Sequence, residues 1–273
     1  MREECHMYDD LIQIVRLACT EILRIYDSPF TVETKSDNSP LTQADLRAHR
    51  AIEAGLKDID SSIPIISEES AIPPYAIRRD WDRYWLVDPL DGTREFVNRN
   101  GEFTVNIALI ENHRSILGLV GVPVGDRIYI GDVEENQAFC IEGNDRRTIQ
   151  TRPLPGDSIT VVVSRSHGGR RLQRYLHLVE TEFGMVERKS LGSSLKFCLM
   201  ADGEADFYPR LGPTSEWDIA AAQAVLVAAG GEVCLFDGAP MLYNKKAELL
   251  NSDFMAISDR RVSWMDRLPP LPE

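Results

Sequence analysis

The sequence lacks the features of a membrane-spanning or disulfide-stabilised protein. None of its 273 residues lies in a run of the roughly 18 consecutive apolar residues that a membrane span needs. The N-terminal segment is rich in acids and has no apolar core, which argues against a secretory signal. The cysteines are odd in number and form no C-x-x-C pair: Cys5, Cys19, Cys140, Cys198 and Cys234. We therefore expect a reduced, cytoplasmic protein with no integral membrane segment.

Positive charge is also scarce. The chain has 30 Lys and Arg against 43 Asp and Glu, which gives a formal net charge of −13. An acidic surface repels the phosphates of nucleic acids and of anionic lipids, so broad nucleic-acid binding would lack its main electrostatic driving force. Acidic sites suit cations instead. We expect no nucleic-acid partner.

The composition is that of a globular protein. Apolar residues make up 43% of the chain, close to the globular average, and no low-complexity tract interrupts them. At about 150 residues per domain, the length fits one large domain or two closely packed halves. The first half reads as a sheet with flanking helices, and strands and helices alternate after the loop around 153–156. We predict a mixed α/β fold with subdomains 1–155 and 156–273.

Hydrophobic periodicity locates the individual elements. Apolar residues from Leu11 to Tyr26 recur at helical spacing, and a capping-box-like Thr42-x-x-Asp45 places Asp45 in the first turn of a second helix. Further helices are predicted over 170–183, 194–201 and 217–229. Strands are predicted over 63–66, 84–87, 103–109, 116–122, 127–130, 137–140, 159–163, 205–208, 233–236 and 254–257.

Carboxylates follow one of these buried strands directly. The run from Trp85 to Thr93 delivers Asp88 and Asp91, three positions apart, into a turn that also contains Pro89 and Gly92. Carboxylates this close repel one another, and a hard divalent cation is the usual relief, with Mg²⁺ as the first candidate. The alternative interpretation is that both acids only cap a turn, because Asp, Pro and Gly are ordinary turn residues.

Two further acids favour a site over a turn. A second strand ends in Glu68-Glu69, and Asp218 is predicted to open the helix that follows Trp217. By itself, Asp218 would be read as a capping group or as a partner of the helix dipole. The repeated placement of acids at the ends of elements favours a metal site.

The three acidic segments together resemble the lithium-sensitive, Mg²⁺-dependent phosphatases of the inositol monophosphatase superfamily. The motifs are Glu68-Glu69, the run DPLDGT that begins at Asp88, and Trp217-Asp218. The resemblance implies a five-layered α-β-α-β-α sandwich with the active site between its two subdomains. It also implies two or three Mg²⁺ ions per site. The metal ligands it implies are Glu68, Asp88, the Leu90 carbonyl, Asp91 and Asp218, with Asp45 supporting a further, weaker position.

The wider segment 88–110 is most similar to the CysQ-type 3'(2'),5'-bisphosphate nucleotidases of that superfamily. Segments 164–167, 192–197 and 208–214 strengthen the match. A bisphosphorylated nucleotide has a second phosphate that is not cleaved, and Lys196, Arg210 and His167 are suitable donors to it. Taken singly, each would be read as a surface charge or a structural histidine. Two residues depart from the subgroup: Arg94 stands for a common Lys, and Glu216 is expected to add negative charge near the substrate.

The resemblance implies direct attack by water on the phosphate. Thr93 and Glu68 orient the water, and the backbone N–H groups of Gly92 and Thr93 bind the phosphate at a helix start. The candidate catalytic residues are Thr93, Glu68 and Asp45. The candidate substrate ligands are Gly92, Thr93, His167, Ser193, Lys196, Arg210 and Asp218.

The implied reaction is hydrolysis of adenosine 3',5'-bisphosphate to AMP and phosphate, which clears a by-product of sulfate assimilation. Its sulfated precursor is a second candidate substrate. One alternative is an inositol or sugar monophosphatase with the same metal site, and a remoter one is a non-catalytic nucleotide-binding sensor. The sequence leaves open a monomer or a homodimer, and peripheral association with the cytoplasmic face of the inner membrane.

Overall fold

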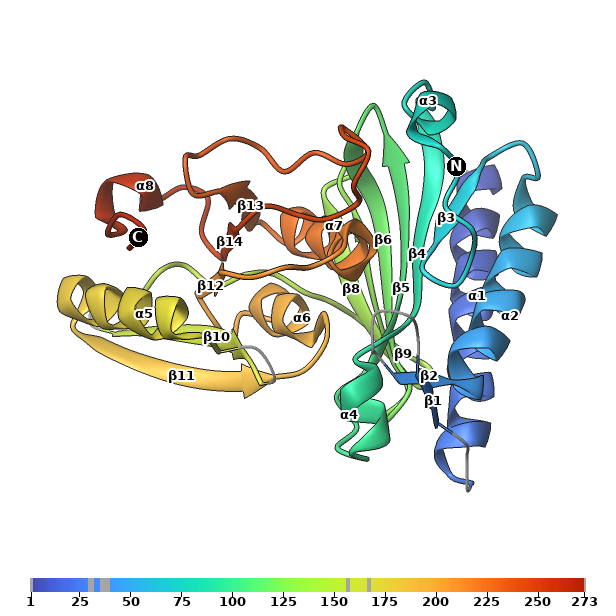
Figure 1. The fold of residues 1–273 in the computed structure, drawn as a ribbon, viewed down its shortest axis with the longest axis horizontal. Helices are drawn as coiled ribbons and strands as arrows, with labels where there is room; N and C mark the ends of the chain where they lie inside the picture. Colours follow the sequence, from blue (N-terminus) through green and yellow to red (C-terminus); the bar gives the residue numbers. More distant parts are fainter. Residues whose placement is uncertain (1, 29–31, 35–39, 156–157, 166–167, 273) are drawn as a thin grey trace.

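The computed structural model describes residues 2–28, 32–34, 40–155, 158–165 and 168–272 (Figure 1). The helices are α1 (Arg2–Tyr26), α2 (Gln43–Ile59), α3 (Tyr75–Arg78), α4 (Thr93–Val97), α5 (Arg170–Phe183), α6 (Leu195–Ala201), α7 (Ala220–Ala228) and α8 (Trp264–Arg267), with a 3₁₀ turn, η1 (Glu216–Asp218). The strands of the first half are β1 (Val32–Thr34), β2 (Pro40–Thr42), β3 (Ile65–Ser67), β4 (Arg83–Asp91), β5 (Thr104–Glu111), β6 (Arg114–Val122), β7 (Arg127–Asp132), β8 (Gln137–Glu142) and β9 (Asp145–Thr148). Those of the second half are β10 (Ser158–Ser164), β11 (Met185–Leu191), β12 (Phe207–Arg210), β13 (Glu232–Leu235) and β14 (Phe254–Ile257).

Two large sheets organise the chain. The first has seven strands in the order β3-β4-β5-β6-β7-β8-β9, antiparallel except for the parallel pair β3 and β4. The second has five strands in the order β11-β10-β12-β14-β13, with β10 parallel to both neighbours. The chain passes from one sheet to the other between Thr148 and Ser158. β1 and β2 pair separately as a small antiparallel sheet.

The sheets alternate with helices in five layers. Helices α1 and α2 cover the outer face of the seven-stranded sheet, α6 and α7 lie between the two sheets, and α5 and α8 cover the far face of the five-stranded sheet (Figure 1). The predicted α-β-α-β-α sandwich is confirmed. Among the described residues, no helix is long and apolar enough to span a membrane.

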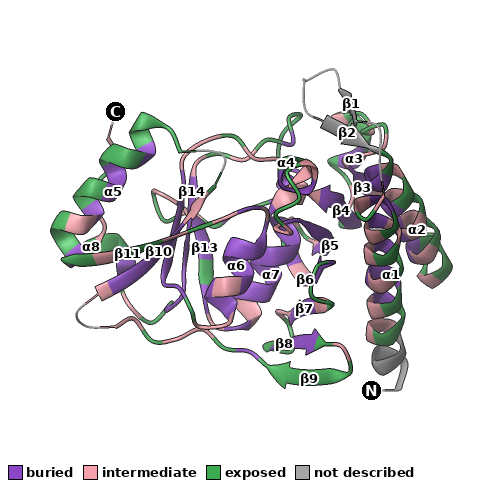
Figure 2. Cartoon of the chain, turned by 90° about the horizontal axis from the view of Figure 1, so that it is seen from below, coloured by how far each residue is buried: buried purple, intermediate pink, exposed green. Residues whose placement is uncertain are grey.

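The outer and the central helices differ in the faces that they bury. Helix α1 buries one stripe, including Leu11, Val15 and Ile22, against the first sheet, as its helical spacing predicts. Helix α7 is buried almost throughout because a sheet covers each side, as Figure 2 shows. A Cβ atom at Gly118 of β6 would lie 2.0 Å from the carbonyl oxygen of Ala221, so the helix packs directly on the strand backbone.

The core between the sheets joins the two halves of the chain. One continuous cluster contains Leu86 and Ile110 of the first sheet, Val162 and Phe254 of the second, and the buried face of α7. A shared core fixes the two sheets relative to each other. Side chains from both halves can therefore form one rigid site at the boundary.

Most predicted elements are present, but four strands and the short helices α3 and α8 were not predicted, and one predicted helix is divided. Strands β9 and β11 have no buried residues, β1 and β2 pair with each other as a separate small sheet, and none of the four was predicted. The helix predicted over 217–229 is interrupted, because Glu216–Asp218 forms the 3₁₀ turn η1 and α7 begins only at Ala220.

Candidate active site

The parallel pairing of β3 with β4 places two acids side by side. Ser67 is in register with Val87, and the backbone N–H of the following Glu68 donates to the Val87 carbonyl oxygen at 3.2 Å. Glu68 and Asp88 therefore leave the sheet at the same level. This juxtaposition is a consequence of strand register and needs no long-range side-chain contact.

An irregularity in β4 brings Asp91 to the same end of the sheet. The pairing of β4 with β5 shifts register between Asp88 and Asp91. Pro89 has no N–H to donate in that stretch, and the Leu90 N–H donates to Asp88 Oδ1 at 3.0 Å. Both acids therefore lie within an irregular strand that continues to Asp91, and not in a turn after a strand that ends at Val87, which corrects the prediction.

Asp218 comes from the other side of the site, on η1. Its Oδ2 accepts a hydrogen bond from the Ser215 N–H at 2.9 Å, as part of a capping box. Asp218 therefore ends a 3₁₀ turn and does not open α7, which corrects the prediction. The cap holds the carboxylate in one orientation.

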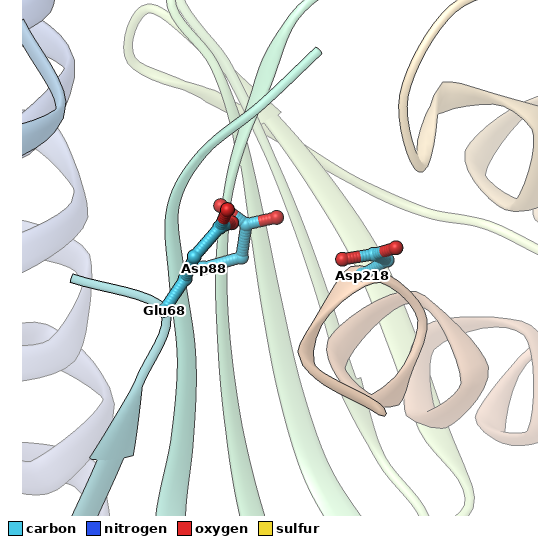
Figure 3. A group of neighbouring side chains, drawn as sticks. All are labelled: Glu68, Asp88 and Asp218. Atoms are coloured by element: carbon cyan, nitrogen blue, oxygen red, sulfur yellow. The ribbon is translucent and has the colours of Figure 1, made fainter. Parts of the chain in front are cut away.

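Three carboxylates converge although they come from three separate elements. Glu68, Asp88 and Asp218 point toward one another in Figure 3, and each offers an oxygen within 4.8 Å of the others. They line a pocket of about 350 Å³, together with Asp91 and the Leu90 segment. Asp88 is only 1% exposed.

Burial and mutual repulsion disfavour the charged forms of these acids. The pKa of Asp88 lies well above its ordinary value because the carboxyl is buried and faces the charges of Glu68, Asp91 and Asp218. Burial also raises the pKa of Asp91 to about 6, although Lys196 opposes the rise. Oxygen ligands crowded in this way are the donor set of a hard divalent cation such as Mg²⁺, so the residues present fit the metal that the family resemblance implies.

A buried network of hydrogen bonds connects Asp91 to three polar side chains. Asn106 Nδ2 lies 3.5 Å from Asp91 Oδ2, and Asn106 Oδ1 accepts a hydrogen bond from Ser194 Oγ at 2.8 Å. The Thr104 and Ser194 hydroxyls are 2.9 Å apart. Thr104 and Asn106 are polar residues at fully buried positions of an otherwise apolar strand. The alternation of polar and apolar residues in this strand was visible in the sequence. The hydrogen-bond partners of the polar residues were not.

Two basic side chains also line the pocket, and we call Lys196 and Arg210 its basic side and Glu68, Asp88, Asp91 and Asp218 its acidic side. Both basic side chains are more than nine-tenths buried. Lys196 Nζ donates to the carbonyl oxygens of Leu191 and Ser193, and burial lowers its pKa to about 8 although Asp91 opposes the shift. Arg210 Nη2 donates to the Pro213 carbonyl at 2.9 Å. Its buried Nε has no hydrogen-bond partner among the described residues, and a buried donor of this kind suits an anion.

The turn that ends at Gly92 joins the acidic side to the pocket floor. Gly92 has a φ of 90° and precedes the single turn of α4. A Cβ atom there would lie 3.1 Å from the Glu102 carbonyl oxygen and 3.3 Å from Ser193 Cβ, so only glycine fits without displacement. Thr93 Oγ1 donates to the Leu90 carbonyl at 3.4 Å, on the pocket wall.

Most of the predicted site residues meet in this pocket. Those that line it are Glu68, Asp88, Leu90, Asp91, Gly92, Thr93, Ser193, Lys196, Arg210 and Asp218. Asp45 does not line it: it is buried in the first turn of α2, and its charge contributes to the raised pKa of Asp88. His167 lies outside the described residues. The roles of all these residues stay predictions.

The lining of the pocket differs from the prediction at Glu216 and at several unpredicted residues. Glu216 does not line the pocket, because its buried carboxylate accepts the Asn244 N–H at 2.8 and 3.0 Å. The expectation that it adds charge near the substrate is therefore wrong. Glu95 and Ser164 line the pocket and were not predicted. Their signal was weak, because a single Glu or Ser in a short segment is an ordinary surface residue.

Comparisons with known sequences identify the family of the chain. The model of the inositol monophosphatase family matches residues 5–262. A relative named 3'(2'),5'-bisphosphate nucleotidase CysQ, from Escherichia coli O6:H1, is 46% identical over 254 residues, which cover 91% of this chain and 98% of the relative. The protein of the same name from Salmonella typhimurium is 44% identical over the same shares of both chains.

Solved structures show the same fold. The crystal structure of CysQ from Bacteroides thetaiotaomicron, a bacterial member of the inositol monophosphatase family, has a TM-score of 0.81 and 38% identity, and covers 93% of this chain and 98% of that one. An inositol monophosphatase from Zymomonas mobilis has a TM-score of 0.73 at 23% identity, covering 93% and 95%. The match over residues 5–262 and the similarity of these relatives show that the chain belongs to the inositol monophosphatase family.

Proposed function

We propose that this protein is a Mg²⁺-dependent phosphatase that removes the 3'-phosphate of adenosine 3',5'-bisphosphate, giving AMP and phosphate. The observation that carries the proposal is that one pocket is lined both by four carboxylates and by two buried basic side chains. The acidic side suits cations at the phosphate that is cleaved. The basic side suits the phosphate that is not. The names of the relatives support the nucleotide as the substrate.

The acidic side provides the metal site. Glu68, Asp88, Asp91, Asp218 and the Leu90 carbonyl would hold Mg²⁺, and its charge would offset the mutual repulsion of the four carboxylates. When bound, the cations supply positive charge that neutralises the phosphoryl oxygens, lowers the pKa of water and stabilises the leaving oxygen.

Residues of the chain place the attacking water and take its proton. Thr93 Oγ1 is held at the pocket wall by the Leu90 carbonyl and orients the water together with Glu68. The Glu68 carboxylate accepts the proton as the water oxygen bonds to phosphorus. The bond from phosphorus to the 3'-oxygen breaks, and that oxygen takes a proton from solvent. Asp91 keeps its orientation through Asn106, so the reacting groups are in place before substrate arrives.

The basic side binds the second phosphate. Lys196 presents an ammonium to an anion that enters the pocket, and Arg210 presents a guanidinium whose buried Nε has no hydrogen-bond partner in the described part of the chain. An inositol or sugar monophosphate has no second phosphate to occupy these donors. The nucleotide is therefore favoured over that alternative. A non-catalytic sensor is disfavoured because the four carboxylates of the acidic side and Thr93 all line the pocket.

The same proposal includes a physiological role. Removing adenosine 3',5'-bisphosphate clears a by-product of sulfate assimilation, and Li⁺ would inhibit by occupying the second metal position. The cytoplasmic location, with or without peripheral contact with the inner membrane, stays a prediction. So does assembly as a monomer or a homodimer.

The test is phosphate release at saturating Mg²⁺ from adenosine 3',5'-bisphosphate and inositol 1-phosphate, each with and without Li⁺. We expect a large preference for the nucleotide, formation of the 5'-monophosphate and loss of activity with Li⁺. A preference for inositol 1-phosphate would keep the metal site and overturn the assignment of the basic side. Binding of the nucleotide without turnover would favour the sensor.

A further inference from the structure

Glu102 connects the two halves of the molecule beside the pocket. It lies in the loop between α4 and β5, and its Oε2 and Oε1 accept hydrogen bonds from Arg165 Nε at 2.8 Å and Nη2 at 2.5 Å. Oε2 also accepts the Gly192 N–H at 2.7 Å. Arg165 follows β10 and Gly192 follows β11, so one carboxylate holds two separate segments of the second half.

The segment at Gly192 packs closely against the backbone of Glu102. A Cβ atom at Gly192 would lie 2.7 Å from the Glu102 carbonyl oxygen and 2.5 Å from Glu95 Cγ. Gly92 approaches the same carbonyl oxygen from the other wall of the pocket. Ser193 has a φ of 42°, a left-handed conformation that a serine keeps only where its surroundings impose it.

The segment that Glu102 holds also holds Lys196. Lys196 Nζ donates to the carbonyl oxygens of Leu191 and Ser193, the two residues on either side of Gly192. The tripeptide 191–193 therefore has Glu102 bonded to its central N–H and Lys196 bonded to its flanking carbonyls. A movement of this tripeptide would move the ammonium group within the pocket.

We propose that Glu102, fixed by Arg165, is a positioning residue that places Lys196 for the second phosphate of the substrate and so determines the preference for bisphosphates. The inference rests on the proposed function, in which Lys196 binds that phosphate. An exposed ion pair alone would contribute little. The Glu102 side chain is only 21% exposed and accepts a two-pronged pair and a backbone N–H, which fixes its geometry.

The experiment compares Glu102→Gln and Arg165→Met with the control Glu180→Gln. Glu180 forms an ion pair with Arg188 on α5 and β11, and neither residue lines the pocket. KM and kcat are measured for adenosine 3',5'-bisphosphate and for adenosine 3'-monophosphate, which lacks the second phosphate. Binding of the product AMP is measured by calorimetry as a readout that does not depend on turnover.

We expect KM for the bisphosphate and the dissociation constant for AMP to rise about tenfold in both Glu102→Gln and Arg165→Met, as loss of a charged hydrogen bond predicts. We expect kcat and KM for the 3'-monophosphate to change by less than about threefold, and the double variant to be little worse than Glu102→Gln, because the two residues act as one unit. Glu180→Gln should match the wild type.

The outcomes separate the inference from the proposed function. A wild-type protein without preference for the bisphosphate would overturn the proposed function and this inference with it. A wild-type preference that survives unchanged in both Glu102→Gln and Arg165→Met would overturn the inference alone. A fall in kcat on both substrates with unchanged KM would also overturn it, since that pattern indicates a disturbed metal side.

Discussion

The acidic and basic sides of the pocket shift the pKa values of their groups in opposite directions, and in both cases burial disfavours the charged form. On the acidic side, burial and repulsion raise the pKa values of Asp88, Asp91 and Asp218. On the basic side, burial lowers the pKa of Lys196. Each side disfavours its own charge until a ligand of the opposite charge arrives.

The two sides also differ in how they are built. Register and the irregular stretch of β4 hold three of the four acids on the first half of the chain, while Lys196 and Arg210 come from the second half. Because of this difference, we expect that substitutions can change the reaction rate and the substrate preference separately. Substitutions on the acidic side should affect turnover of every substrate, and those on the basic side should affect one class of substrate.

The largest effect is expected for Asp91→Asn. This change removes a half-buried carboxylate that lies 3.5 Å from Asn106 Nδ2 and that belongs to the proposed metal site. We expect kcat/KM to fall about a thousandfold or more on both the bisphosphate and the 3'-monophosphate, because several kcal/mol of transition-state stabilisation depend on the metal. Asp266→Asn, on the exposed surface of α8, is the matched control and should keep full activity. Loss on only one substrate would contradict the separation of the two sides.

Thr93→Ala should produce the next largest effect. The variant loses the hydroxyl that orients the attacking water and keeps every metal ligand. We expect kcat to fall about 100-fold, with little change in KM or in the Mg²⁺ concentration for half-maximal activity. Steady-state kinetics over a range of Mg²⁺ concentrations measures all three quantities. Thr93→Ser restores the hydroxyl and should recover most of the activity, and unchanged turnover in Thr93→Ala would remove the residue from the mechanism.

Arg210→Met should affect the bisphosphate alone. The guanidinium lies on the basic side and its Nε has no hydrogen-bond partner among the described residues. We expect KM for the bisphosphate to rise about 10- to 100-fold, with kcat little changed, because a charge-assisted contact is lost. Kinetics on the 3'-monophosphate, expected to be unaffected, serve as the internal control. An equal loss on both substrates would place Arg210 in the chemistry of the acidic side.

The smallest effect is a pH-dependent stabilisation by Mg²⁺. The pKa of Asp91 rises from its ordinary 3.8 to about 6 in the folded protein. A carboxyl whose pKa is raised by folding contributes its full stability at a pH below its ordinary pKa. That contribution is lost as the pH rises through the pKa of the folded state. Without a cation, the melting temperature should therefore fall over this interval.

Calorimetry with Mg²⁺ and with a chelator should show that Mg²⁺ offsets this loss of stability. We expect Mg²⁺ to raise the melting temperature by a few degrees more at about pH 7.5 than at about pH 5. Asp91→Asn should reduce the difference. A Mg²⁺ effect that is equal at both pH values would contradict a carboxylate site with raised pKa values.

Buried features of the fold were predictable from the sequence, and exposed ones were not. The alternation of Phe103 to Leu109 and the helical spacing in α1 reflect burial against a core, which selects apolar residues. Strand β9 is exposed at all four positions, and β11 lies at a sheet edge with most residues exposed. Without a buried face, neither strand leaves a periodic signal.

The acids of the site were predictable because each follows a recognisable element within a family motif. Glu68 and Asp88 meet through strand register, which follows once the two strands are parallel. The contacts of Glu102 and of Glu216 were not predictable. Their partners, Arg165 and Asn244, lie far away in the sequence, and only the packing of the two halves brings them together.

The central claim is that the basic side recognises the second phosphate while the acidic side performs the chemistry. The most direct test is the ratio of kcat/KM for adenosine 3',5'-bisphosphate to that for adenosine 3'-monophosphate, in the wild type and in Lys196→Met, at saturating Mg²⁺. We predict a large ratio in the wild type that falls by about tenfold or more in the variant, with the 3'-monophosphate rate nearly unchanged. A ratio that is the same in both proteins would contradict the account.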